Sequence, residues 1–225
     1  MALPIALEQL VGGEHVAFLR EMALLGRDLA PVVPDARDGD DVVVLVHGFL
    51  ASAGVFRPLR TRLEREAGAR IATFSHPPGA GIRRIARRLD EVVQQIPRGA
   101  RVTVVGHSLG GVVARWYVQE MGGHARVAQT ISMASPFGGV DDPQLLVGAD
   151  LHGQSELLKR LRDRALVCGV PHMSIVAEQD SVVAGDATAC LGFGDVAILP
   201  KRGHNGVLFC EKAASLVIER VKQRR

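Results

Sequence analysis

The sequence has few cysteines and no long apolar segment, and each shortage excludes a class of protein. Only three cysteines, Cys168, Cys190 and Cys210, occur in the 225 residues, and none forms a C-x-x-C pair. This number predicts buried thiols and not a disulfide framework, although a single Cys168–Cys190 bridge stays open. The longest stretch without Asp, Glu, Lys or Arg covers 15 residues, 42–56. A helix of that length is too short to cross a bilayer.

Charge of one sign is also scarce. The 27 Lys and Arg against 24 Asp and Glu leave a net charge of +3, which is too small to indicate a nucleic-acid partner. Four arginines, Arg83, Arg84, Arg87 and Arg88, fall on the polar side of a predicted amphipathic helix at 82–96. We interpret them as a solvated helix face, with transient contact to an anionic membrane surface as the alternative.

The first residues do not form a secretory signal, because Glu8 and Glu14 interrupt the apolar positions. We therefore expect a soluble, cytoplasmic protein. Residues 1–40 are predicted to form a helical lead-in, over 5–29, and a linker, and residues 41–225 the main domain. Hydrophobic residues make up 47% of the chain, which is ample for one packed core.

What the sequence does contain is an alternation of short β-branched runs and helical segments. Strands are predicted at 42–46, 70–74, 101–105, 127–133, 172–177 and 195–199, and helices at 55–67, 82–96, 109–121 and 211–223. This order predicts an α/β fold with a mostly parallel central sheet and helices on both faces. The long gap at about 137–168 predicts a short cap or lid insertion.

A nucleophile motif follows the third predicted strand. Gly106-His107-Ser108-Leu109-Gly110 is a G-x-S-x-G sequence between a strand and a helix. A serine in such a sharp turn has strained backbone angles, so that its neighbours two positions away must be nearly free of side chains. A phosphate-binding turn is the alternative, but no lysine follows the glycines.

Later strands supply candidates for the acid and the base that a serine nucleophile needs. Asp180 lies in the loop after the strand at 172–177, and Glu178 is the competing carboxylate. Among the eight histidines, only His204 follows Asp180, lies beyond a strand and has small neighbours. We predict that Ser108, His204 and Asp180 form a catalytic triad.

Two backbone N–H groups are expected to form the oxyanion hole. One belongs to Leu109, directly after the nucleophile, and the other to Phe49, in the loop after the first core strand. The alternative is that His47-Gly48 is only a strand-ending turn. Candidate walls of an acyl pocket, which could equally be core residues, are Leu50, Phe56, Phe137, Val182 and Val183.

Taken together, these segments resemble bacterial lipases and esterases of the α/β-hydrolase superfamily. The similarity spans about 41–222 and includes His47-Gly48-Phe49, the serine turn, and Ser135-Pro136-Phe137-Gly138-Gly139, as well as Asp180 and Gly203-His204. It implies an α/β-hydrolase fold and a carboxylic ester hydrolase acting on a small-molecule ester or lipid, with Ser108 as nucleophile, His204 as base and Asp180 as orienting acid. No cofactor is expected. Calcium-binding relatives place Asp where this chain has Gly206, so no calcium site is expected.

Three alternative chemistries use the same serine: acyl transfer, thioester cleavage and amide cleavage. A non-catalytic binding protein with this fold is the alternative of another class, although such proteins usually lack a triad member. The sequence does not fix the oligomeric state.

Overall fold

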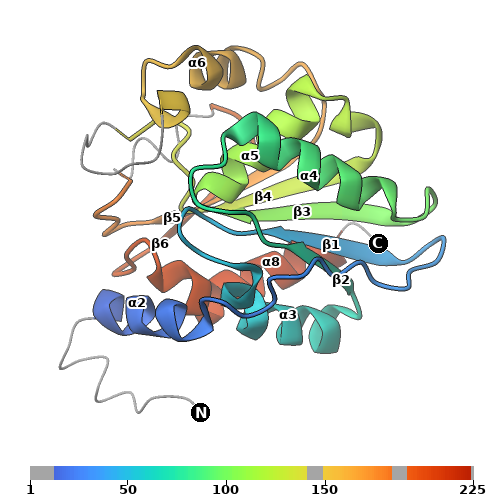
Figure 1. Ribbon diagram of the computed structural model, residues 1–225, viewed down its shortest axis with the longest axis horizontal. Coiled ribbons are helices and arrows are strands. Elements are labelled where there is room, and N and C mark those ends of the chain that lie inside the picture. Colours follow the sequence, from blue (N-terminus) through green and yellow to red (C-terminus); the bar gives the residue numbers. More distant parts are fainter. Residues whose placement is uncertain (1–12, 141–148, 184–191, 224–225) are drawn as a thin grey trace.

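The computed structural model describes residues 13–140, 149–183 and 192–223, and a six-stranded sheet forms its centre (Figure 1). The strands are β1 (Asp41–Val46), β2 (Arg70–Phe74), β3 (Arg101–His107), β4 (Val127–Met133), β5 (His172–Ala177) and β6 (Asp195–Leu199). They lie in the order β2-β1-β3-β4-β5-β6, and every neighbouring pair is parallel. The predicted parallel sheet is therefore confirmed, and in the described residues all six strands run the same way.

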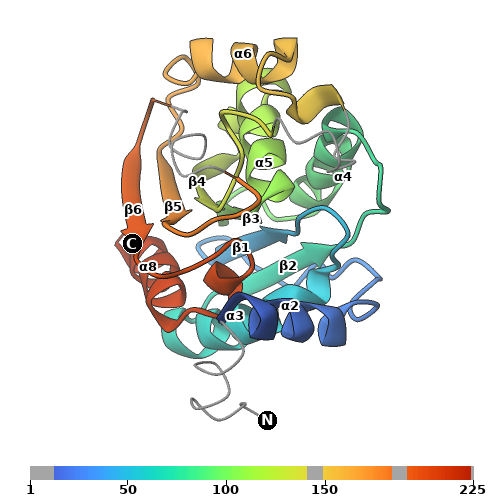
Figure 2. The same cartoon turned by 90° about the vertical axis from the view of Figure 1, so that its left-hand side faces the viewer.

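Helices cover both faces of this sheet, which explains why its central strands are almost wholly apolar. One face carries α4 (Ile82–Gln94), α5 (Leu109–Glu120) and α6 (Glu156–Asp163), and the other carries α2 (Gly13–Leu24), α3 (Arg57–Arg62) and α8 (Glu211–Lys222) (Figures 1 and 2). Val42, Val44 and Val46 of β1 point into the core that the sheet forms with α4, α5 and α6, which we call the first core. Val43 and Leu45 point into the second core, which the sheet forms with α3 and α8. All five residues are fully buried. Among the described helices, none is both long and apolar enough to cross a membrane.

Some predicted boundaries differ from the structure. The helix predicted at 55–67 is composite: a 3₁₀ turn at Ala53–Phe56 precedes α3, and a π-helical turn at Leu63–Ala67 follows it. Gly68, with φ of 61°, ends this composite helix, a conformation that favours glycine. The lead-in helix predicted over 5–29 is seen in part: α2 ends at Leu24, residues 25–29 are not helical, and residues 1–12 lie outside the described part.

The segment between β4 and β5 packs against α5 where it is described. Leu157, Leu158 and Leu161 of α6 are buried in the first core. The fully buried guanidinium of Arg115 on α5 donates hydrogen bonds to the carbonyls of Ala165 and Val170, at 3.1 Å each. These contacts fix the end of the predicted insertion to the body of the protein; residues 141–148 lie outside the described part.

Cysteine pairing is settled for two of the three thiols. Cys168 and Cys210 are free, and Cys190 lies outside the described residues.

Candidate active site

The three predicted triad residues meet at the carboxyl edge of the sheet. Ser108 follows β3, Asp180 follows β5 and His204 follows β6. His204 Nε2 lies 3.0 Å from Ser108 Oγ, and His204 Nδ1 lies 2.9 Å and 3.1 Å from the two carboxylate oxygens of Asp180. The imidazole can therefore accept the serine proton at one nitrogen while its other nitrogen donates to the carboxylate.

The turn that carries Ser108 is strained as the motif predicts. Ser108 has φ of 51° and ψ of −122°, which a residue with a side chain rarely adopts. A Cβ at Gly106 would lie 2.2 Å from the backbone of Gly110, and a Cβ at Gly110 would lie 2.0 Å from the carbonyl oxygen of Val46. Both positions thus exclude any side chain, and the strand and helix meet closely enough to hold the serine at the tip of the turn.

The carboxylate at His204 is Asp180 and not its competitor Glu178. The Asp180 side chain is fully buried, and its Oδ1 accepts the backbone N–H groups of Val182 and Val183, at 2.9 Å and 2.7 Å. Glu178 instead accepts the backbone N–H of Lys201. The two N–H donors fix the Asp180 carboxylate in the position from which it can orient the histidine.

His107 holds the backbone of the histidine loop. Its Nε2–H donates to the carbonyl oxygen of His204 at 3.0 Å. Burial, followed by the proximity of His204, lowers the pKa of His107 to about 3. The ring is therefore neutral at physiological pH, so it adds no positive charge beside the candidate base.

The two candidate oxyanion-hole segments lie against the serine. Leu109 is the first residue of α5, so its backbone N–H has no acceptor within the helix, and the positive end of the helix dipole lies at this point. Gly48 is packed so closely that a Cβ added to it would lie 3.1 Å from the Cβ of Ser108. The loop after β1 therefore brings the Gly48–Phe49 peptide next to the nucleophile.

His47 fixes the orientation of that peptide. Its Nε2 accepts the backbone N–H of His76 at 3.0 Å, so the proton of the neutral ring is on Nδ1, which donates to the Gly48 carbonyl at 2.8 Å. Burial lowers the pKa of His47 to about 3, which keeps this tautomer uncharged. In a planar trans peptide the N–H points opposite to the carbonyl. Holding the Gly48 oxygen toward His47 therefore turns the Phe49 N–H away from that ring.

The lead-in helix α2 contacts both sides of the site, which the sequence did not reveal. The carboxylate of Glu14 accepts the backbone N–H of Asn205 at 2.6 Å and of Gly206 at 3.1 Å, directly after His204. Near the other end of α2, the Ser52 hydroxyl donates to the carbonyls of Leu24 and Arg27, at 3.3 Å and 3.0 Å. One helix thus connects the histidine loop with the loop after β1.

A second carboxyl group of α2 faces the same region. Burial is the main cause that raises the pKa of Glu21, whereas the nearby His204 lowers it and Glu14 raises it further. Sequence patterns gave no signal for Glu14 or Glu21, because both simply occupy helix positions far from the motif in the chain.

The predicted pocket walls lie in different environments. Leu50, with φ of 57°, is 60% exposed beside the oxyanion loop, and Val182 is partly buried. Phe137 is fully buried and packs edge-on against His172, so it is a core residue in this structure and not an exposed wall. Among the described residues, no three His, Cys, Asp or Glu side chains are grouped so that they could hold a metal ion.

Comparison with known proteins assigns a family to this arrangement. A family model of palmitoyl protein thioesterase matches residues 42–185, a range that includes Ser108 and Asp180 and ends before His204. A search of curated protein sequences gives no match.

Solved structures give the fold. The chain is similar to a monoacylglycerol lipase from Paleococcus ferrophilus, with 16% identity, a TM-score of 0.67, and coverage of 88% of this chain and 100% of the lipase. It is also similar to the mature Bacillus licheniformis lipase BlEst2, with 15% identity, a TM-score of 0.68 and coverage of 87% and 99%. A thioesterase domain from the curacin biosynthetic pathway aligns with 13% identity, a TM-score of 0.61 and coverage of 83% and 92%. The chain has the α/β-hydrolase fold and belongs to the palmitoyl protein thioesterase family.

Proposed function

We propose that this protein hydrolyses carboxylic esters through an acyl-enzyme on Ser108. The observation that carries the proposal is the hydrogen-bonded chain from the buried Asp180 carboxylate through His204 to the Ser108 hydroxyl. A buried carboxylate fixes the tautomer of the histidine and stabilises the imidazolium that forms when the serine proton is taken. The strained turn at Ser108 and the family membership support the same chemistry.

In the proposed reaction, Ser108 Oγ attacks the ester carbonyl while His204 Nε2 takes its proton. The backbone N–H groups of Phe49 and Leu109 stabilise the oxyanion. His204 then protonates the leaving alcohol, and water, activated by the same histidine, hydrolyses the acyl-enzyme. The substrate class is a small-molecule ester or lipid.

Thioester cleavage is a second candidate, because the family model that matches is that of a thioesterase. The same triad and the same oxyanion-hole N–H groups would suffice for thioester cleavage. A thiol, with a pKa near 8.5, leaves more readily than an alcohol, so a thioester depends less on proton donation by the histidine.

The test compares an ester and a thioester of the same acyl group, p-nitrophenyl butyrate and butyryl-N-acetylcysteamine. We expect the wild type to hydrolyse at least one of them, and Ser108→Ala to lower kcat by about 10⁴- to 10⁶-fold with a nearly unchanged melting temperature. Ser215→Ala on α8 is the matched control and should keep full activity. Turnover retained by Ser108→Ala would remove this serine from its role.

A further inference from the structure

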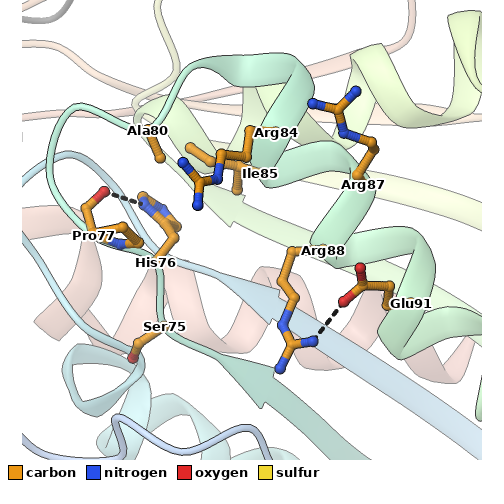
Figure 3. A pocket seen from close by; sticks show the side chains of 9 residues that line it. All are labelled: Ser75, His76, Pro77, Ala80, Arg84, Ile85, Arg87, Arg88 and Glu91. Atoms are coloured by element: carbon orange, nitrogen blue, oxygen red, sulfur yellow. Dashed lines mark hydrogen bonds and ion pairs between the residues drawn. The ribbon is translucent and has the colours of Figure 1, made fainter.

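A hollow of about 570 Å³ lies between the loop after β2 and α4 (Figure 3). None of its lining residues belongs to the triad. They are Ser75, His76, Pro77, Ala80, Arg84, Ile85, Arg87, Arg88 and Glu91. We refer to this site as the arginine hollow.

The arginine hollow carries excess positive charge. The lining contains three arginines, Arg84, Arg87 and Arg88, but a single carboxylate, that of Glu91, which is already paired with Arg88. Among the residues that the structure describes, neither Arg84 nor Arg87 forms an ion pair. Figure 3 shows the guanidinium groups of Arg84 and Arg88 on the side of α4 where His76 and Ser75 lie, whereas that of Arg87 points away.

Among the described residues, Glu91 is the one carboxylate in the lining that could balance this charge. Like charges at i and i+4, as in Arg84 and Arg88, repel each other on a helix. Two other described carboxylates lie on α4 or near it: Asp90 accepts hydrogen bonds from Tyr117 and Gln94, and Asp150 lies 3.6 Å from the position a Cβ would take on Gly81, at the start of the helix. Neither is part of the lining. An anion in the hollow would relieve the repulsion.

The hollow adjoins the candidate active site through two stacked histidines. His76, which is 9% exposed, lines the hollow, and its ring stacks on that of His47 with centroids 3.8 Å apart. Gly48, the residue after His47, packs against Ser108. Since β1 separates β2 from β3, the loops that carry His76 and Ser108 are about 10 Å apart across the sheet, two strand spacings.

We propose that the arginine hollow binds a phosphate group on the leaving-group side of the substrate that is cleaved at Ser108. Guanidinium groups present N–H donors in the planar geometry that phosphate oxygens accept, and arginine keeps its charge at any working pH. The loops that carry His76 and Ser108 are two strand spacings apart, which suits a substrate whose phosphate and acyl carbon are several bonds apart. This inference rests on the proposed function for the acyl half of the substrate, but the anion site itself does not.

The first measurement is binding alone, by calorimetric titration of the full-length protein with pyrophosphate. Arg84→Gln/Arg88→Gln should weaken binding at least tenfold. Arg37→Gln/Arg98→Gln, which removes the same charge at the other end of the strands, should bind like the wild type. Equal affinity in all three proteins, or no binding to the wild type, overturns the site. This result is independent of catalysis.

The second measurement compares kcat/KM for butyryl-coenzyme A, for a short-chain phosphatidic acid and for uncharged p-nitrophenyl butyrate. We expect Arg84→Gln/Arg88→Gln to lower the ratio of charged to uncharged kcat/KM at least tenfold, mainly through KM. A loss with coenzyme A thioester identifies a soluble phosphate carrier, and a loss with phosphatidic acid identifies a lipid headgroup. An unchanged ratio for both overturns the proposal. If the wild type hydrolyses none of the three, the proposed function fails, and the pyrophosphate titration still decides the hollow.

Discussion

At the scale of single residues, the site depends on backbone positions that few side chains tolerate. Ser108 is held at φ of 51°, and the glycines on either side leave no space for a Cβ. Such a conformation costs about 1–3 kcal/mol, which the packing of β3 and α5 offsets. The result is a hydroxyl fixed 3.0 Å from the imidazole of His204 before any substrate arrives, so little reorganisation is needed when the reaction starts.

His47 is expected to act as a positioning residue for the oxyanion hole. His47→Phe keeps an aromatic ring stacked on His76 but removes the N–H that holds the Gly48 carbonyl. We expect kcat to fall about 10- to 100-fold with a small change in KM, because a misplaced N–H stabilises the oxyanion poorly.

Phe49→Ala provides the contrast for this variant. It removes a side chain but keeps the backbone N–H that the mechanism uses, so its kcat should fall less than that of His47→Phe. A larger loss of kcat in Phe49→Ala, or an unchanged kcat in His47→Phe, would contradict the role assigned to His47.

At the scale of elements, the catalytic edge is built by loops from four strands and by one helix outside the sheet. α2 reaches the histidine loop through Glu14 and the loop after β1 through the carbonyl of Leu24, which accepts from the Ser52 hydroxyl. Val16 and Ala17 bury its inner face. The lead-in helix is thus a structural part of the candidate site.

Glu14→Gln tests this role. The amide keeps one oxygen acceptor but presents an NH₂ group to the other backbone N–H, so one hydrogen bond is lost and the remaining one is no longer charge-assisted. We expect kcat to fall about tenfold at unchanged KM, and the free energy of unfolding to fall by about 1–3 kcal/mol. The measurements are steady-state kinetics and urea unfolding.

The control for Glu14→Gln is Glu156→Gln, at a side chain that is 93% exposed on α6, and it should change neither quantity. If Glu14→Gln lowers stability while the folded enzyme keeps its full kcat, Glu14 only supports the fold and does not position His204.

Elements differed in how well the sequence predicted them. Strands such as Val42–Val46 are predictable because burial on both faces requires a local run of β-branched residues. The serine turn is predictable because its sterics require glycines at fixed spacing. The contact between Glu14 and the histidine loop joins positions 191 residues apart, and no local pattern records such a pairing. Whether Phe137 lines a pocket or the core was left open for a related reason: an apolar residue near a motif has the same sequence pattern in both positions.

At the scale of the whole molecule, the sheet and the helices on its two faces form three layers. This arrangement places the candidate reacting groups at one edge of the sheet and leaves several histidines buried. Burial lowers the pKa of His47 and His107 to about 3 and that of His172 well below 6.5. These rings stay neutral in the folded protein, but in the unfolded chain they protonate near pH 6.5. The unfolded state therefore binds more protons below pH 6.5, and stability is lost as the pH falls.

Each such histidine contributes a slope of about 1.4 kcal/mol per pH unit, so three predict a loss of about 4 kcal/mol per unit near pH 5. Urea unfolding at pH 7.5, 6 and 5 measures this slope. His172→Gln should reduce it by about a third, and His124→Gln, at an exposed position, should leave it unchanged. A free energy of unfolding that is constant between pH 7.5 and 5 would contradict the buried neutral state of these rings.

The central claim is that Ser108 is the nucleophile and that His204 activates it. The most direct test is the intact mass of the full chain after incubation with a fluorophosphonate, followed by peptide mapping. The account predicts one adduct per chain, located on Ser108, absent in Ser108→Ala and formed far more slowly in His204→Ala. An unlabelled Ser108, or labelling at the same rate without the histidine, would contradict it.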